Sequence, residues 1–211
     1  MSQRFFAAVL VVLALQSAPL AAQVGRSQSV LDANLATEAE LSSVPGIAPA
    51  VARAIIAARP FASITALDAV LAPTLTPAQR TAAYARIFVH LNLNTATNAE
   101  MLLVPGVGRK MAHEFEEYRP WTSLAQFDRE IGKYVDKAEV ARLQQYVFVP
   151  IDLNTASDET IATIPGLGRR MLREFKEYRP YANMAQFRRE IGKYVDAKEV
   201  ARLERFVTLG K

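Results

Sequence analysis

Apolar and polar residues follow one another along positions 32–211 with the spacing of short amphipathic helices. Met111, Phe115 and Tyr118, for example, recur at helical intervals and would lie on one face of a helix. No alternating apolar and polar run is long enough to indicate a β-strand of useful length. We therefore expect an all-α fold.

The pattern repeats every 60 residues without a gap. Two residue types mark its register: Asn34, Asn94 and Asn154, and Pro45, Pro105 and Pro165. Residues 131–136 and 191–196 are identical. Because internal repetition decides the architecture, we expect three tandem four-helix units, each a helix-hairpin-helix followed by a degenerate second helical hairpin. Their predicted bounds are 32–90 for the first unit, 91–150 for the second unit and 151–211 for the third unit.

Capping residues predict where the helices of the second unit begin. Thr97 followed by Glu100 indicates a capping box at the first helix, and the equivalent residues open the first unit. Ser123 is a cap for the third helix, and Asp136 with Glu139 indicates a further box at the fourth. The apolar joins between units predict semi-rigid docking rather than flexible tethering.

A Pro-Gly-x-Gly segment, or its decayed form, separates the first two predicted helices of each unit. It occupies residues 164–170 in the third unit, 104–110 in the second and 44–50 in the first. Gly166 supplies the positive φ that stops a helix abruptly, and Leu167 would plug the space between the helices. Gly168 would let a ligand approach the backbone closely. The sequence therefore predicts a tight hairpin.

The helix after this hairpin begins with free N–H groups beside basic side chains, an arrangement that favours an anion such as phosphate. The predicted phosphate-binding residues are Gly106, Val107, Gly108, Arg109 and Lys110 in the second unit, and Gly166, Leu167, Gly168, Arg169, Arg170 and Arg173 in the third. Backbone phosphate contacts carry no sequence information, so binding would be nonspecific and sensitive to salt. The alternative is a tight turn whose basic side chains are merely solvated.

The three hairpins are not equivalent. In the first unit Ala48 replaces the second glycine, Pro49 removes an amide donor and no base follows, so we expect a structural unit. Arg173 adds to the third hairpin, whereas nearby acidic residues oppose the second: Glu114, Glu116 and Glu117. We therefore expect the third unit to hold the stronger site.

Three other groups of side chains have structural interpretations. We expect Asn94 and Asn154 to hold the turn before the first helix. The aromatic residues around the Arg-Pro pairs are expected to be core contacts rather than base-stacking platforms: Tyr118, Trp121, Tyr178 and Tyr181. Lys133 and Lys193 are explained more simply by a capped turn than by phosphate.

Composition restricts the chemistry. The net charge is +4, and positions 151–211 carry twelve basic and nine acidic residues, so the basic excess lies mainly there. The absence of cysteine excludes disulfides, thiolate metal sites and cysteine nucleophiles. His90 and His113 have no ligand constellation around them. We expect no catalytic residue, metal, cofactor or small-molecule substrate.

Residues 1–22 have the pattern of a secretory signal peptide: a basic start, a short apolar core at 5–15 and a small-residue exit. The apolar run is shorter than the roughly 20 residues that a membrane-spanning helix needs. We expect cleavage after Ala22, a linker at 23–31, and an exported protein of the periplasm or cell envelope without a stable membrane span. The alternative is an uncleaved membrane anchor.

Leu-Asn-Thr-Ala at 93–96, Pro-Gly-Val-Gly at 105–108 and Tyr118-Arg119 resemble the helix-hairpin-helix module of the competence DNA-receptor (ComEA) family, and the third unit repeats them. The resemblance implies an exported or membrane-tethered protein that binds double-stranded DNA without sequence preference during uptake. The family's second Gly-x-Gly is replaced here by the turn at 132–136.

A second hypothesis is a non-enzymatic periplasmic scaffold whose hairpins contact an envelope protein, the DNA face having decayed. The acidic balance of the second unit, with seven basic and eight acidic residues, favours it, whereas the arginine-rich third hairpin favours DNA.

Overall fold

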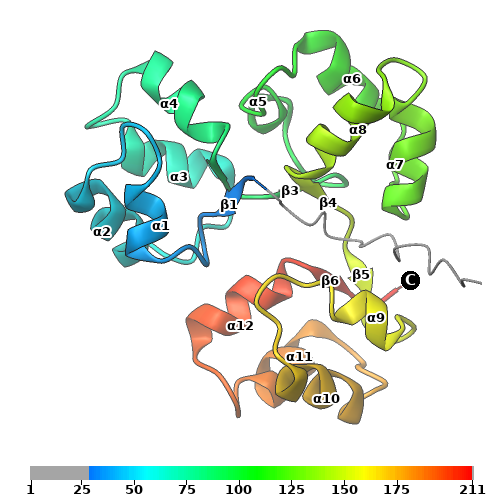
Figure 1. Ribbon diagram of the computed structural model, residues 1–211. Coiled ribbons are helices and arrows are strands. Elements are labelled where there is room, and N and C mark those ends of the chain that lie inside the picture. Colours follow the sequence, from blue (N-terminus) through cyan, green and yellow to red (C-terminus); the bar gives the residue numbers. More distant parts are fainter. Residues whose placement is uncertain (1–28, 211) are drawn as a thin grey trace, which may run out of the picture.

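The computed structural model describes residues 29–210, in which the same order of elements occurs three times (Figure 1). The first set is β1 (Leu31–Asp32), α1 (Glu38–Ser42), α2 (Pro49–Ala57), α3 (Ile64–Leu71), α4 (Pro77–Tyr84) and β2 (Ile87–Phe88). The second is β3 (Leu91–Asn92), α5 (Asn98–Met101), α6 (Arg109–Glu117), α7 (Leu124–Ile131), α8 (Lys137–Gln144) and β4 (Val147–Phe148). The third is β5 (Ile151–Asp152), α9 (Asp158–Ile161), α10 (Arg169–Glu177), α11 (Met184–Ile191), α12 (Ala197–Glu204) and β6 (Val207–Thr208). The predicted all-α class is confirmed.

The predicted signal peptide at 1–22 lies outside the described residues, as does most of the linker predicted at 23–31. The end of that linker belongs to the fold instead. Val30 is buried in the core shared by the first and second units, and Leu31 begins β1, which pairs with β2. Within residues 29–210, no helix has the length and apolarity needed to cross a bilayer.

Three short parallel strand pairs, which the sequence pattern did not reveal, close the three sets. β1 pairs with β2, β3 with β4 and β5 with β6, each over two residues. The apolar joins at 88–92 and 148–152, from which semi-rigid docking was expected, contain β3 and β5 and the last residues of β2 and β4. Two residues are too few to show an alternating pattern, which explains the miss. The pairing places the start and end of each unit side by side.

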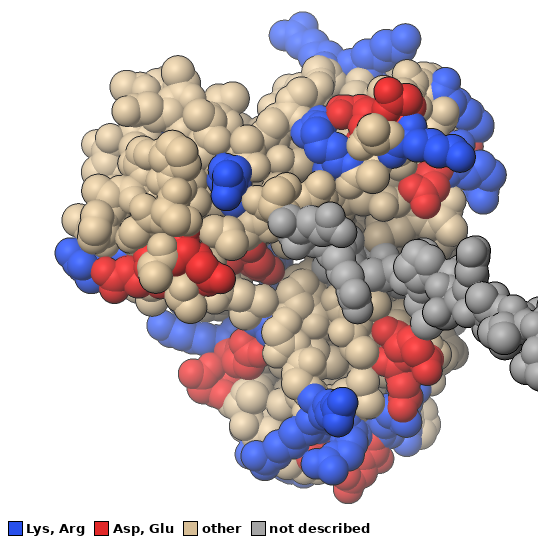
Figure 2. All heavy atoms as spheres, viewed as in Figure 1, with Lys and Arg blue, Asp and Glu red and all other residues tan. Residues whose placement is uncertain are grey.

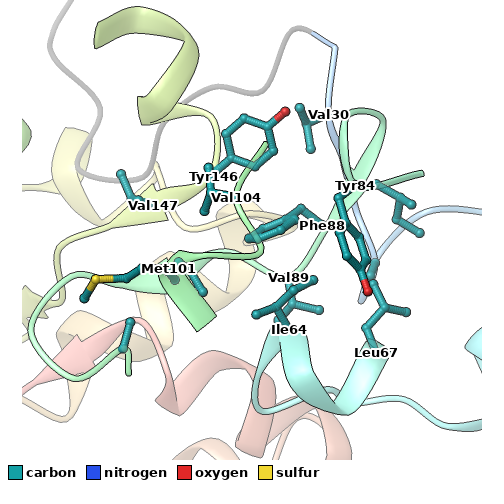
Figure 3. Close-up of a cluster of buried hydrophobic side chains, with 14 of the residues drawn as sticks. Val30, Ile64, Leu67, Tyr84, Phe88, Val89, Met101, Val104, Tyr146 and Val147 are labelled. Atoms are coloured by element: carbon teal, nitrogen blue, oxygen red, sulfur yellow. The ribbon is translucent and has the colours of Figure 1, made fainter. Parts of the chain in front are cut away.

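The first and second units share one hydrophobic core (Figure 3). Phe88 lies edge-on to Tyr84 of its own unit and to Tyr146 of the second, with ring centroids 6.0 and 5.0 Å apart. The third unit has a core of its own, to which Phe148 contributes from the join by packing on Phe206 at 4.7 Å. Buried aromatic rings at the joins therefore fix the units against one another.

Most helices begin at a side-chain cap. Thr97 accepts from the backbone N–H of Glu100, whose carboxylate accepts from the N–H of Thr97, so this capping box is confirmed. The box predicted at Asp136 is only half formed. Asp136 caps the N–H of Glu139, but the Glu139 carboxylate binds Arg142 instead, because a nearby guanidinium is a stronger partner than a backbone amide.

An asparagine clamp joins the start of each unit to its middle. Oδ1 of Asn94 accepts from the backbone N–H of Trp121 at 2.6 Å, and its Nδ2 donates to the Trp121 carbonyl at 2.9 Å. Asn34 and Asn154 make the same exchange with their units. Nε of Arg119 also donates to the Leu93 carbonyl at 2.6 Å. Asn94 and Asn154 thus have a structural role as expected, but their side chains hold a segment 27 residues away rather than the turn before the first helix, which the side chains of Asn92 and Asp152 hold.

The clamped segments contain buried aromatic residues. Trp121 and Tyr181 are each 2% exposed, so their predicted place in the core is confirmed. The indole Nε1 of Trp121 donates to the Phe115 carbonyl at 2.8 Å. The three Arg-Pro peptide bonds that precede these positions are cis, a feature that the sequence did not reveal.

The third unit also contacts the first (Figure 1). Nη2 of Arg205 donates to the carbonyl of His90 at 2.9 Å, and Nδ1 of His90 lies 3.5 Å from Oδ2 of Asp32. The side chain of Leu35 lies against the hairpin glycine Gly166. These contacts bring the three units together around a common centre.

We predict that Asn94→Ala lowers the free energy of unfolding by about 2–3 kcal/mol, because it removes two hydrogen bonds and leaves backbone groups of the buried Trp121 segment unpaired. Urea denaturation measures the change. Asn98→Ala is the control, since Asn98 is exposed in the same unit and its replacement should change stability by less than about 0.5 kcal/mol. Equal effects of the two variants would contradict the clamp.

Candidate nucleic-acid interface

Between its first two helices, each unit carries the predicted hairpin, which we call its corner: residues 44–50, 104–110 and 164–170. Gly46, Gly106 and Gly166 have φ of 87°, 81° and 72°, so the predicted left-handed conformation is confirmed. The apolar residue that follows points inward. Val107 is 7% exposed, and Leu167 is half-buried against the core of the third unit. Each corner is thus anchored on its inner side while its glycines remain exposed.

The second glycine of the corner is not required by the fold. Gly108 and Gly168 have φ of −97° and −78°, which any residue adopts. A Cβ built on either glycine would meet nothing within 4 Å. Ala48 occupies the equivalent place in the first unit with φ of −67°. The space in front of Gly108 and Gly168 is therefore open to a partner that needs close access to the backbone.

The helices that follow the corners have free N-termini. Of the twelve helices in the described part of the chain, nine have a side chain that caps the first turn. The three without such a cap are α2, α6 and α10, each of which directly follows a corner. In α6 and α10 the N-cap residue is a glycine with no side chain, so the first amides remain available to an anion.

Basic side chains surround these free amides. Arg109 and Lys110 open α6, Arg169 and Arg170 open α10, and Arg173 follows one turn later; all five are exposed. None of them takes part in an ion pair within residues 29–210. The Arg170 guanidinium lies 5.5 Å from the centroid of the Tyr194 ring. The structure thus brings together the residues predicted for each site, without neutralising them.

The first unit lacks this charge. Figure 2 shows lysine and arginine over the second and third units, while the visible face of the first unit is mostly uncharged. The corner helix α2 carries one basic residue, Arg53, which is exposed and paired with Glu38 at 2.8 Å. Pro49 begins α2 and has no N–H to offer.

In the second hairpins of the second and third units, the lysine of the turn is paired within the unit. The Lys133 ammonium binds the Glu130 carboxylate and lies 5.1 Å from the Tyr118 ring centroid. Hydrogen bonding to Lys133 holds the pKa of Glu130 below its usual range, and Arg129 adds to the effect. Lys193 repeats this arrangement with Glu190. This neutralisation agrees with the structural interpretation of Lys133 and Lys193.

The acidic residues that count against the second site are not arranged around its corner cations. Glu114 is 7% exposed within α6, and Glu117 lies 3.5 Å from Nε2 of His113 near the end of that helix. The carboxylates therefore reduce the net charge of the second unit without capping the free end of α6.

Two arginines behind the corners were not predicted from the sequence. Arg142 in α8 and Arg202 in α12 reach the inner side of the second and third corners. Both lie on amphipathic helices among other charges, so their 60-residue spacing was the only available signal. The first unit has Ala82 at the corresponding position.

Comparison with known families finds a helix-hairpin-helix motif at residues 26–77. The matched segment contains the corner of the first unit, and the corners of the second and third units join helices in the same order. No curated protein and no solved structure matches the chain. The motif is generally associated with nucleic-acid binding.

We predict opposite effects of alanine at the two glycines of the third corner. Gly166→Ala should lower the free energy of unfolding by about 1–3 kcal/mol, because alanine is strained at positive φ. Gly168→Ala should leave it unchanged or raise it by up to about 1 kcal/mol, because the open site accepts a Cβ. Urea denaturation compares the variants. A comparable loss in both would show that the fold itself requires Gly168.

Proposed function

We propose that the protein binds double-stranded DNA without sequence preference, through the corners of its second and third units. The observation that carries the proposal is the coincidence, at α6 and α10, of an uncapped helix N-terminus, a glycine that the fold does not require and unpaired basic side chains. The helix-hairpin-helix motif supports a nucleic-acid partner.

The geometry suits a phosphate group held by the backbone. Amide groups at the start of α10 would donate to phosphate oxygens, and the absence of a Cβ at Gly168 would let the sugar-phosphate chain come close. Arg169, Arg170 and Arg173 would neutralise neighbouring phosphates. Binding of this kind releases counterions and weakens steeply as salt rises.

The biological setting is part of the same proposal. The signal-like residues 1–22 support export to the periplasm or cell envelope, and the resemblance of the second and third units to the competence DNA-receptor family supports a role in DNA uptake. We propose a non-enzymatic role, in which the first unit supports the other two rather than binding DNA. An envelope protein that receives the DNA would be the natural second partner.

We predict that Arg169→Gln/Arg170→Gln weakens binding to a random 20-bp duplex at least about tenfold at low salt and lowers the salt slope by about 2, because two phosphate contacts are lost. Fluorescence anisotropy at several salt concentrations measures both quantities. Arg188→Gln/Arg189→Gln is the matched control. It removes an adjacent arginine pair from the same unit, but those arginines bind Glu204 and Glu190, so affinity should change less than about twofold.

We predict that Gly168→Ala weakens duplex binding about three- to tenfold without loss of stability, because its methyl group would occupy the space needed by the phosphate chain. The same anisotropy titration measures the effect, and Gly108→Ala tests the second unit. If the unsubstituted protein shows no salt-dependent binding, the scaffold hypothesis replaces DNA binding.

A further inference from the structure

The third corner is held from behind by one buried arginine. Arg202 of α12 is only 3% exposed. Its Nη1 donates to the carbonyl of Pro165 at 2.7 Å, while Nε and Nη2 donate to the carboxylate of Glu199 at 2.7 and 2.6 Å. The guanidinium therefore connects α12, in the second hairpin of the third unit, to the glycine corner in the first hairpin of the same unit.

This hydrogen bond fixes a peptide plane. Because the C=O and N–H of a trans peptide point in opposite directions, holding the Pro165 carbonyl toward Arg202 turns the N–H of Gly166 away from it. The N–H of Gly166 donates to no acceptor within the described residues, and Gly166 is exposed. The donor thus points away from Arg202 and lies on the same exposed corner as the amides that begin α10.

The three units form a graded series at this position. In the second unit, the side chain of Arg142 is 33% exposed and binds Glu139, but it makes no hydrogen bond to the corresponding carbonyl of Pro105. In the first unit, Ala82 can make none. The series follows the basic charge of the corners, which is absent in the first unit and greatest in the third.

We infer that Arg202 is a positioning residue for DNA binding by the third unit, which orients the Gly166 amide toward phosphate without touching the DNA itself. The inference rests on the proposed function. Because Glu199 neutralises the guanidinium, the contribution of Arg202 is one of geometry more than of charge. The third corner is therefore held by a contact that the second corner lacks, although both have the same left-handed glycine.

The test is the charge-balanced pair Arg202→Met/Glu199→Gln, which removes the carbonyl contact and leaves the net charge unchanged. We expect Kd for a random 20-bp duplex to rise about fivefold, and the DNA-induced shift of the Gly166 amide resonance in ¹H–¹⁵N spectra to be lost. The matched control is Arg142→Met/Glu139→Gln in the second unit. It should change Kd less than twofold, because no carbonyl contact is lost there.

A further variant covers the case in which the double substitution unfolds the third unit, which circular dichroism detects. Arg202→Lys keeps the charge, but lysine lacks the planar guanidinium that binds Glu199 and Pro165 at once. It should therefore also raise Kd, by less than the double substitution does. A folded variant that keeps both the parent Kd and the Gly166 amide shift overturns the positioning role alone. A parent chain that does not bind DNA overturns the proposed function, and the positioning role with it.

Discussion

The exchange of two hydrogen bonds between an asparagine amide and a distant backbone segment is the constraint on which each unit depends. Asn154 lies just after the first strand of its unit, and Tyr181 lies beyond the second helix. Closing this link fixes both ends of the helix-hairpin-helix, so that its corner lies between two anchored segments. Arg179, which donates to the carbonyl of Ala156, ties the same two segments a second time.

The corner differs from the rest of the unit in how its polar backbone groups are used. Elsewhere, the first turns of helices are satisfied by serine, threonine, asparagine or aspartate. At Gly168 no side chain is available, although serine would fit the same backbone conformation and space. A helix end without a side-chain cap gives the fold slightly less stability than a capped one, and this small loss is expected where the amides bind an external ligand.

Much of the fold was predictable because its signals are local. The caps at Thr97 and Ser123 and the positive φ of Gly106 each depend on a few neighbouring residues. The two-residue strands were not predictable, since β3 and β4 are defined only by pairing across 56 positions. The contact of Arg202 with Pro165 joins residues 37 apart, and nothing local marks it.

The candidate site was likewise predictable only in part from the sequence. The composition of the hairpin identified its glycines and bases, because those residue types have few other uses at a helix start. The sequence could not show that the cations of the corners are free while those at Lys133 and Lys193 are paired, because the distinction depends on which carboxylates the fold places nearby. The sequence did separate the two glycines: the positive φ that it assigned to Gly166 is confirmed, while the close approach of a ligand at Gly168 stays a prediction.

The parallel pairing of the first and last strands has a consequence for how the chain was assembled. Because β1 and β2 are parallel and adjacent, the chain runs in the same direction where it enters the unit and where it leaves it. The last strand of one 60-residue unit is therefore joined to the first strand of the next by two residues, such as Val89 and His90, and the chain does not have to turn back. Tandem duplication adds a unit to such a fold without remodelling the connections already present.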